Sequence, residues 1–190
     1  MEEPTKPNSL DEILAFFPTI GQPGWAERTI SRLEELGVPR ARTFDATEIL
    51  RAEKKLGCEF PHDLKLILGR LGALQCGDLS WLEPSKIEMG DNLWFFGHLS
   101  VSDQERASRC LLVAEVGSDD YFAYDQDTRS VVELRHDPPG LTSHAPTIAH
   151  LLRYDLLSLH IGQYGWPDAD VCSIVEDAMK RWSDEWGVDA

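Results

Sequence analysis

Residues 45–72 decide the fold, and they read DATEILRAEKKLGCEFPHDLKLILGRLG. Asp45 and Glu48 have the spacing of a capping box, in which each side chain accepts a hydrogen bond from a backbone N–H at the start of a helix. Gly57 can adopt the left-handed conformation that commonly ends a helix. Between these two signals lie Ile49, Ala52, Glu53 and Leu56, at the spacing of a helix. A helix is therefore predicted from about residue 46 to residue 56.

The second half of the stretch predicts a second helix. Pro61 suits a first helical turn, where its missing N–H is no loss. Gly72 closes an apolar stripe made of Leu64, Ile67, Leu68 and Leu71. Because only residues 57–60 separate the two helices, the sequence predicts a helical hairpin.

Beyond Gly77 the pattern changes from helical spacing to short apolar runs separated by turn residues. The breaks at Gly117–Asp120 and Asp125–Thr128 are short enough to join antiparallel neighbours. Pro138-Pro139-Gly140 is interpreted as the end of the sheet. The predicted strands are Leu79–Leu82, Asn92–Phe96, Leu111–Val116, Tyr121–Tyr124 and Ser130–Leu134.

Helical spacing returns on both sides of this meander. Residues 148–159 predict a closing helix, and Trp25, Thr29, Leu33 and Leu36 predict a helix before the hairpin. A capping box at Ser9–Glu12 and a helix from Asp168, with Val171, Val175, Met179, Trp182 and Trp186 on one face, extend the chain at its ends. The predicted class is α+β, with a central antiparallel sheet and helices packed around it.

The sequence predicts that the chain has three parts. Residues 1–44 are an N-terminal helical extension, residues 45–160 are the core domain, and residues 161–190 are an acidic C-terminal helix packed on the core. Length agrees with one domain plus extensions, since 190 residues can bury an adequate core without disulfides.

The charge balance excludes some partners. The chain carries 18 basic and 33 acidic side chains, a formal net charge of −15, with 42% hydrophobic residues. Nucleic acids and anionic membranes are disfavoured, because proteins bind phosphates mainly through Lys and Arg. A basic protein surface is a better electrostatic match.

The cellular location is predicted from the lack of membrane-spanning, signal-peptide and disulfide patterns. No apolar run approaches the ~20 residues that span a bilayer, and the acidic start Met1–Pro4 does not resemble a signal peptide. The cysteines are spaced like neither a disulfide framework nor paired metal ligands. They are Cys58, Cys76, Cys110 and Cys172. Reduced thiols fit best, so we expect a cytoplasmic protein.

The sequence carries no convincing catalytic motif. The sequence has no P-loop, no dinucleotide fingerprint, no HExxH and no G-x-S-x-G. Cys58 and His62 have a spacing that metal sites use, but Pro61 begins a new helix between them. His136–Asp137 and Ser143–His144 supply the residue types of a Ser–His–Asp triad across a Pro-Pro-Gly break, but a triad is defined in space. We expect no enzyme, no cofactor and no metal.

The clearest charge feature is a run of five acidic residues with no basic residue among them: Glu115, Asp119, Asp120, Asp125 and Asp127. A cation site would use such oxygen ligands, but the calcium-loop spacing is missing. Paired carboxylates could serve acid–base catalysis, but nothing supplies a substrate cradle. An acidic patch could bind a basic protein. For any single residue, a solvated turn is the simplest interpretation; for the cluster, we favour partner binding over catalysis.

A second acidic region lies at the end of the chain, where residues 161–190 carry a net charge of −5. Trp182 lies there beside Asp184 and Glu185, and Trp is enriched at the energetic centres of interfaces. These three residues are further candidates for partner binding, although a Trp on a helix more often packs against its own domain.

The stretch Ile49–Lys65 resembles the opening of the SUKH superfamily, which includes the yeast cell-wall-synthesis regulator and many bacterial immunity proteins. The family pattern is a Glu, a Leu-Gly and an apolar-Pro pair that leads into a second helix. Here these are Glu53, Leu56-Gly57 and Phe60-Pro61. Gly72 falls where such proteins end their second helix, although the Asn-Gly often found there is Leu71-Gly72 in this chain.

Later stretches extend the resemblance over about residues 45–160. The family's next element, its central strands, the strand after the turn and its closing helix are matched by Leu79–Ile87, Leu112–Gly117, Tyr121–Asp125, Ser130–Leu134 and Thr147–Leu159.

The resemblance implies an α+β fold, no enzymatic activity and binding to a protein. Many bacterial members are regarded as immunity proteins that neutralise a toxin, often a nuclease, whose basic surface would suit an acidic inhibitor. The expected function is therefore stoichiometric neutralisation of a cognate toxin with a basic surface. The alternative is a regulatory scaffold of the cell-wall-regulator type, which would bind several partners weakly.

Overall fold

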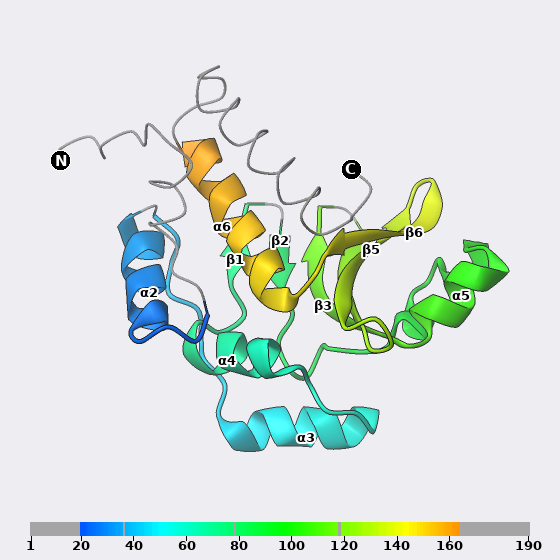
Figure 1. Cartoon of the computed structure of the whole chain (residues 1–190), viewed down its shortest axis with the longest axis horizontal. Helices are drawn as coiled ribbons and strands as arrows, with labels where there is room; N and C mark the ends of the chain where they lie inside the picture. The colour runs from blue at the N-terminus through cyan, green and yellow to red at the C-terminus, as the bar shows by residue number, and fades with distance from the viewer. Residues whose placement is uncertain (1–19, 36, 78, 118, 164–190) are drawn as a thin grey trace.

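The computed structural model describes residues 20–163 except 36, 78 and 118 (Figure 1). The chain is α+β, with a six-stranded antiparallel sheet and helices around it, as predicted. Its helices are α2 (Trp25–Glu35), α3 (Ala46–Leu56), α4 (His62–Arg70), α5 (Val101–Ala107) and α6 (Ile148–Gln163), with 3₁₀ turns η1 (Gly90–Asn92) and η2 (Phe96–His98). Its strands are β1 (Gln75–Cys76), β2 (Leu79–Trp81), β3 (Cys110–Val116), β4 (Asp120–Asp125), β5 (Ser130–His136) and β6 (Pro139–Ala145).

The helical hairpin is confirmed together with its local signals. Asp45 Oδ1 accepts hydrogen bonds from the N–H groups of Thr47 and Glu48, at 2.8 and 2.9 Å, and Glu48 accepts one in return from the Asp45 N–H. Gly57 ends α3 with a φ of 72°. Glu53 is buried and joins the two helices, because its Oε1 accepts the Phe60 N–H at 2.7 Å and contacts Lys65 Nζ at 3.1 Å.

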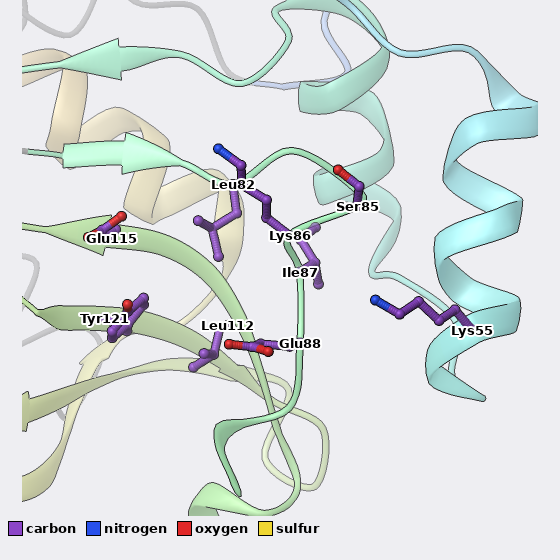
Figure 2. A pocket seen from close by; sticks show the side chains of 9 residues that line it. All are labelled: Lys55, Leu82, Ser85, Lys86, Ile87, Glu88, Leu112, Glu115 and Tyr121. Carbon is purple, nitrogen blue, oxygen red and sulfur yellow. The ribbon is translucent and has the colours of Figure 1, made fainter. Parts of the chain in front are cut away.

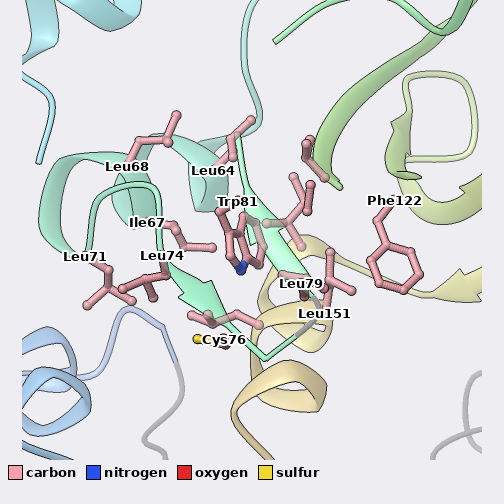
Figure 3. Packing of buried hydrophobic residues seen from close by; sticks show 14 of the residues in the cluster. Leu64, Ile67, Leu68, Leu71, Leu74, Cys76, Leu79, Trp81, Phe122 and Leu151 are labelled. Carbon is pink, nitrogen blue, oxygen red and sulfur yellow. The ribbon is translucent and has the colours of Figure 1, made fainter. Parts of the chain in front are cut away.

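The strands form a meander in which each pairs with the next, in the order β1 to β6. Both faces of the sheet are covered. On one face, α2, α3, α4 and α6 enclose the larger core, and Figure 3 shows the Trp81 ring of β2 between Ile67 of α4 and Leu151 of α6. On the other face, the segment of η1, η2 and α5 places Leu93, Phe95 and Leu99 over the central strands. The site described below lies on this second face.

One predicted strand is wrong. Residues 93–95 instead form a turn between η1, which ends at Asn92, and η2, which begins at Phe96. Leu93 and Phe95 are buried while Trp94 between them is exposed, so the segment imitates the alternation of a strand. β2 pairs directly with β3, however, which leaves no place in the sheet for it.

Strands β1 and β6 and helix α5 were not predicted from the sequence. Pro138-Pro139-Gly140 does not end the sheet: Asp137 and Pro138 form the tight turn between β5 and β6, with His136 opposite Pro139. Pro139 is the first residue of an edge strand, where its missing N–H costs no ladder bond. α5 escaped detection because only Ala107 of its residues is buried, so it has no apolar stripe. The predicted capping box at Ser9–Glu12 and the helix from Asp168 lie outside the described residues.

Candidate partner-binding site

The five clustered acidic residues divide between the two ends of the meander. Glu115, Asp119 and Asp120 lie at or beside the β3–β4 turn, whereas Asp125 and Asp127 lie at the β4–β5 turn. The length of β4 separates the two groups by roughly 17 Å. They therefore make two sites rather than one acidic patch.

The acidic residues at the β4–β5 turn stabilise the fold. Asp125 is only 1% exposed; its Oδ2 accepts a hydrogen bond from Arg106 Nε at 2.7 Å, and its Oδ1 accepts the N–H groups of Asp127 and Thr128. Burial would raise the pKa of Asp125, but these donors outweigh burial and lower it. Asp127 is exposed and pairs with Arg109 Nε at 2.5 Å. Both carboxylates are thus occupied within the chain.

The β3–β4 end carries an exposed aromatic side chain. Trp94 is 65% exposed, and its ring centroid lies 6.1 Å from that of His136. Asp120 holds His136 in place, because its Oδ1 accepts the His136 backbone N–H at 2.8 Å and lies 2.7 Å from Nδ1 of the same residue. Trp is enriched at the energetic centres of protein interfaces, so exposed Trp94 makes this end a candidate protein-binding surface.

Next to this turn lies an open cavity of about 340 Å³ (Figure 2). Leu82 and Leu112 give it an apolar floor, while Glu88, Glu115 and Tyr121 contribute polar groups from the segment after β2, from β3 and from β4. Glu115 and Tyr121 are direct register partners on β3 and β4. We name Glu88, Glu115, Asp119 and Tyr121 the acidic socket.

The carboxylates of the socket lie close enough to Tyr121 to act on its hydroxyl. Burial raises the pKa of Tyr121, and the carboxylates of Glu115, Asp119 and Glu88 raise it further. Carboxylates beside an aromatic face stabilise a Lys or Arg side chain, because they form ion pairs with it and the ring adds a cation–π contact. The socket can therefore receive a basic side chain from another protein. The opposite wall of the cavity is basic, with Lys55 and Lys86.

The histidines that the sequence offered for a catalytic triad contact other side chains than a triad requires. His136 is paired with Asp120 rather than with neighbouring Asp137. The His144 ring packs between Phe122 and Tyr154, at centroid distances of 4.2 and 5.2 Å, and burial lowers its pKa to about 4. Across the residues that the structure describes, no group of three or more His, Cys, Asp or Glu side chains could hold a metal ion.

One buried carboxyl lies far from the socket, in the larger core. Asp155 of α6 is 4% exposed and accepts a hydrogen bond from Trp81 Nε1 at 3.2 Å. Burial raises its pKa to about 7, although the Trp81 indole and the Cys76 thiol act in the opposite direction. This group is a potential source of pH-dependent stability.

The sequence located part of this site. It singled out Glu115, Asp119 and Asp120, but it missed Glu88, Tyr121 and Trp94. Glu88 reaches the socket only because the segment after β2 runs alongside β3, where Leu112 N donates to Glu88 O at 2.9 Å. Trp94 was assigned to a strand, which hid its exposure. The other candidates, Trp182, Asp184 and Glu185, lie outside the described residues.

Comparison with known proteins adds a sequence similarity to this picture. No family model matches the chain, and no solved structure matches it. The chain is similar to an uncharacterized protein of Archaeoglobus fulgidus, with 29% identity over 123 residues that cover 60% of this chain and 71% of that protein. Within the described residues, no helix is long and apolar enough to cross a membrane. What the protein does must therefore be argued from the site itself.

Proposed function

We propose that this protein is a non-enzymatic immunity protein, which neutralises a cognate bacterial toxin by binding it in a one-to-one complex in the cytoplasm. The acidic socket and the adjacent Trp94 form the contact surface. The toxin presents a basic surface, as a nuclease does toward its nucleic-acid substrate.

The observation that carries this proposal is the acidic socket. Carboxylates from two chain segments surround Tyr121 at the mouth of an open cavity, and the chain as a whole carries a net charge of −15. Such a surface accelerates encounter with a basic partner and rejects acidic ones. The order of a helical hairpin, an antiparallel sheet and a closing helix agrees with what the SUKH resemblance implies, which supports the class of function.

The first experiment is co-expression with the product of the immediately upstream gene. A stable one-to-one complex that relieves toxicity, and that weakens as salt is raised, is the expected result. A chain that binds several unrelated proteins at micromolar affinity, with no toxic neighbour, would instead identify a regulatory scaffold.

Charge reversal tests the socket directly. The double variant Glu88→Lys/Glu115→Lys should associate with the toxin on the order of tenfold more slowly at low salt, because it removes the steering field. Stopped-flow association rates measure the effect, which should shrink at high salt. The matched control is Glu59→Lys/Glu105→Lys, which changes the net charge equally at two exposed positions away from the cavity. Equal slowing in both variants would remove the socket from the interface.

Trp94 tests the apolar part of the surface. Its side chain is largely exposed, so Trp94→Ala should leave the unfolding midpoint nearly unchanged while it raises the toxin dissociation constant by about tenfold or more. Calorimetric titration and urea unfolding measure the two quantities. Exposed Val101 on α5 supplies the control as Val101→Ala, and an unaltered dissociation constant for Trp94→Ala would exclude Trp94 from the contact.

A further inference from the structure

A second cavity adjoins the acidic socket, and its charge is of the opposite sign. It measures about 370 Å³ and lies between α3 and residues 83–85. It shares Lys55 and Ser85 with the socket cavity, and Figure 2 shows the Lys55 side chain extending from α3 toward the segment that carries Ser85 and Lys86. We name this second cavity the basic groove.

Two cations that line the basic groove, Arg51 and Lys55, have no side-chain partner among the described residues. Lys86 of the socket cavity, and Lys54 outside both cavities, are likewise unpaired in the described part of the chain. Other cations are paired even though they are exposed, such as Arg40 with Glu34 and Arg109 with Asp127. Acidic side chains are abundant in this chain. The unpaired cations nevertheless gather here, which leaves a local positive charge on an acidic molecule.

The groove walls combine this charge with apolar surface. Phe44, Ala52 and Pro84 are buried side chains that line it. Arg42 pairs with Glu48 and lies over the Phe44 ring, 4.7 Å from its centroid, so the Glu48 carboxylate is already neutralised. Arg51 and Lys55 are left to face an incoming group, against the single remaining carboxylate of Glu83.

We propose that the basic groove binds an extended, acidic segment of a protein partner. Its carboxylates would pair with Arg51 and Lys55, and its apolar side chains would pack on Phe44, Ala52 and Pro84. Successive side chains of an extended segment alternate between two faces, which matches walls of mixed character. Long polyanions such as nucleic acids are disfavoured by the charge of the whole molecule. The proposal does not depend on toxin neutralisation, since it concerns different residues and a partner of opposite charge.

The test is an NMR titration with the capped pentapeptide Glu-Leu-Glu-Leu-Glu at low ionic strength. The backbone amide signals of α3 and residues 83–86 should shift saturably. Lys55→Glu should weaken binding on the order of tenfold, because it reverses a charge that lines the groove. Lys54→Glu is the matched control: it makes the same change one residue away, outside both cavities, and should weaken binding less than twofold.

Three results would overturn this inference: no saturable shift, equal effects of Lys54→Glu and Lys55→Glu, or tighter binding of tripolyphosphate than of the peptide at the same signals. The Glu88→Lys/Glu115→Lys variant separates this test from the previous one. It should retain peptide binding whether or not it binds a toxin, so failure of one proposal leaves the other standing.

Discussion

Replacing Asp125 with alanine should lower the free energy of unfolding by about 3 kcal/mol. The carboxylate is almost fully buried and accepts three hydrogen bonds, from Arg106 and from the N–H groups of Asp127 and Thr128. Its removal leaves a partly buried guanidinium and two turn N–H groups without their acceptor, and such groups are costly when unsatisfied. Urea unfolding followed by circular dichroism measures the loss.

Asp127→Ala is the control from the same turn. Its ion pair with Arg109 joins two side chains that are 60% and 51% exposed, and pairs of this kind contribute less than about 1 kcal/mol. Equal losses for the two variants would show that the turn, rather than the buried carboxylate, sets the stability. The comparison also shows why charge reversal at Asp125 is a poor test of partner binding: the fold would suffer first.

The fold was predictable where its signals are local. The hairpin could be identified because Asp45, Glu48 and Gly57 act on backbone groups within one turn of themselves. The central strands could be identified because both faces of the sheet are covered and the strands are short apolar runs between turns. The alternation of Leu93, Trp94 and Phe95 was misleading, since a turn between two 3₁₀ helices can bury every second side chain as a strand does.

The site was less predictable because its partners are distant in sequence. Asp125 resembled Asp127 in the sequence, and what separates them is Arg106, 19 residues earlier, which reaches one carboxylate inside the protein. Glu88 joins Glu115 only through the pairing of the 82–88 segment with β3. The sequence could therefore name an acidic cluster, but it could not distinguish a structural carboxylate from one that faces a cavity.

The two cavities together suggest how a partner would be oriented. They meet at Lys55 and Ser85, with carboxylates on the sheet side and cations on the α3 side. A partner that filled both would place basic side chains against Glu88 and Glu115 and acidic ones against Arg51. The reverse orientation would bring like charges together, which is unfavourable. If both proposals hold, opposite charges rather than shape would select the direction of binding.

Asp155 should make the protein less stable as the pH rises from about 4 to about 7. The unfolded carboxyl has a pKa of about 3.9, whereas burial raises the folded value to about 7. Below both values the carboxyl is protonated in either state, and its environment costs nothing. Between them only the unfolded state is ionised, so folding loses about 1.4 kcal/mol per pH unit, or roughly 4 kcal/mol in all. Above pH 7 the loss is complete and this contribution becomes constant.

Asp155→Asn isolates this effect, because the amide keeps an oxygen that can accept the Trp81 indole N–H but cannot ionise. The free energy of unfolding is measured in urea at pH 5, 6, 7 and 8. Between pH 5 and 7 it should fall more steeply for the native protein than for the variant. Above pH 7 the two curves should run in parallel. A constant offset between the two curves would report only the packing of the amide, so the slope carries the test. Asp91→Asn, an exposed position, should reproduce the native curve. Parallel curves for Asp155→Asn throughout this range would mean that the carboxyl is ionised in the folded core, held by Trp81 and Cys76 more strongly than its burial opposes.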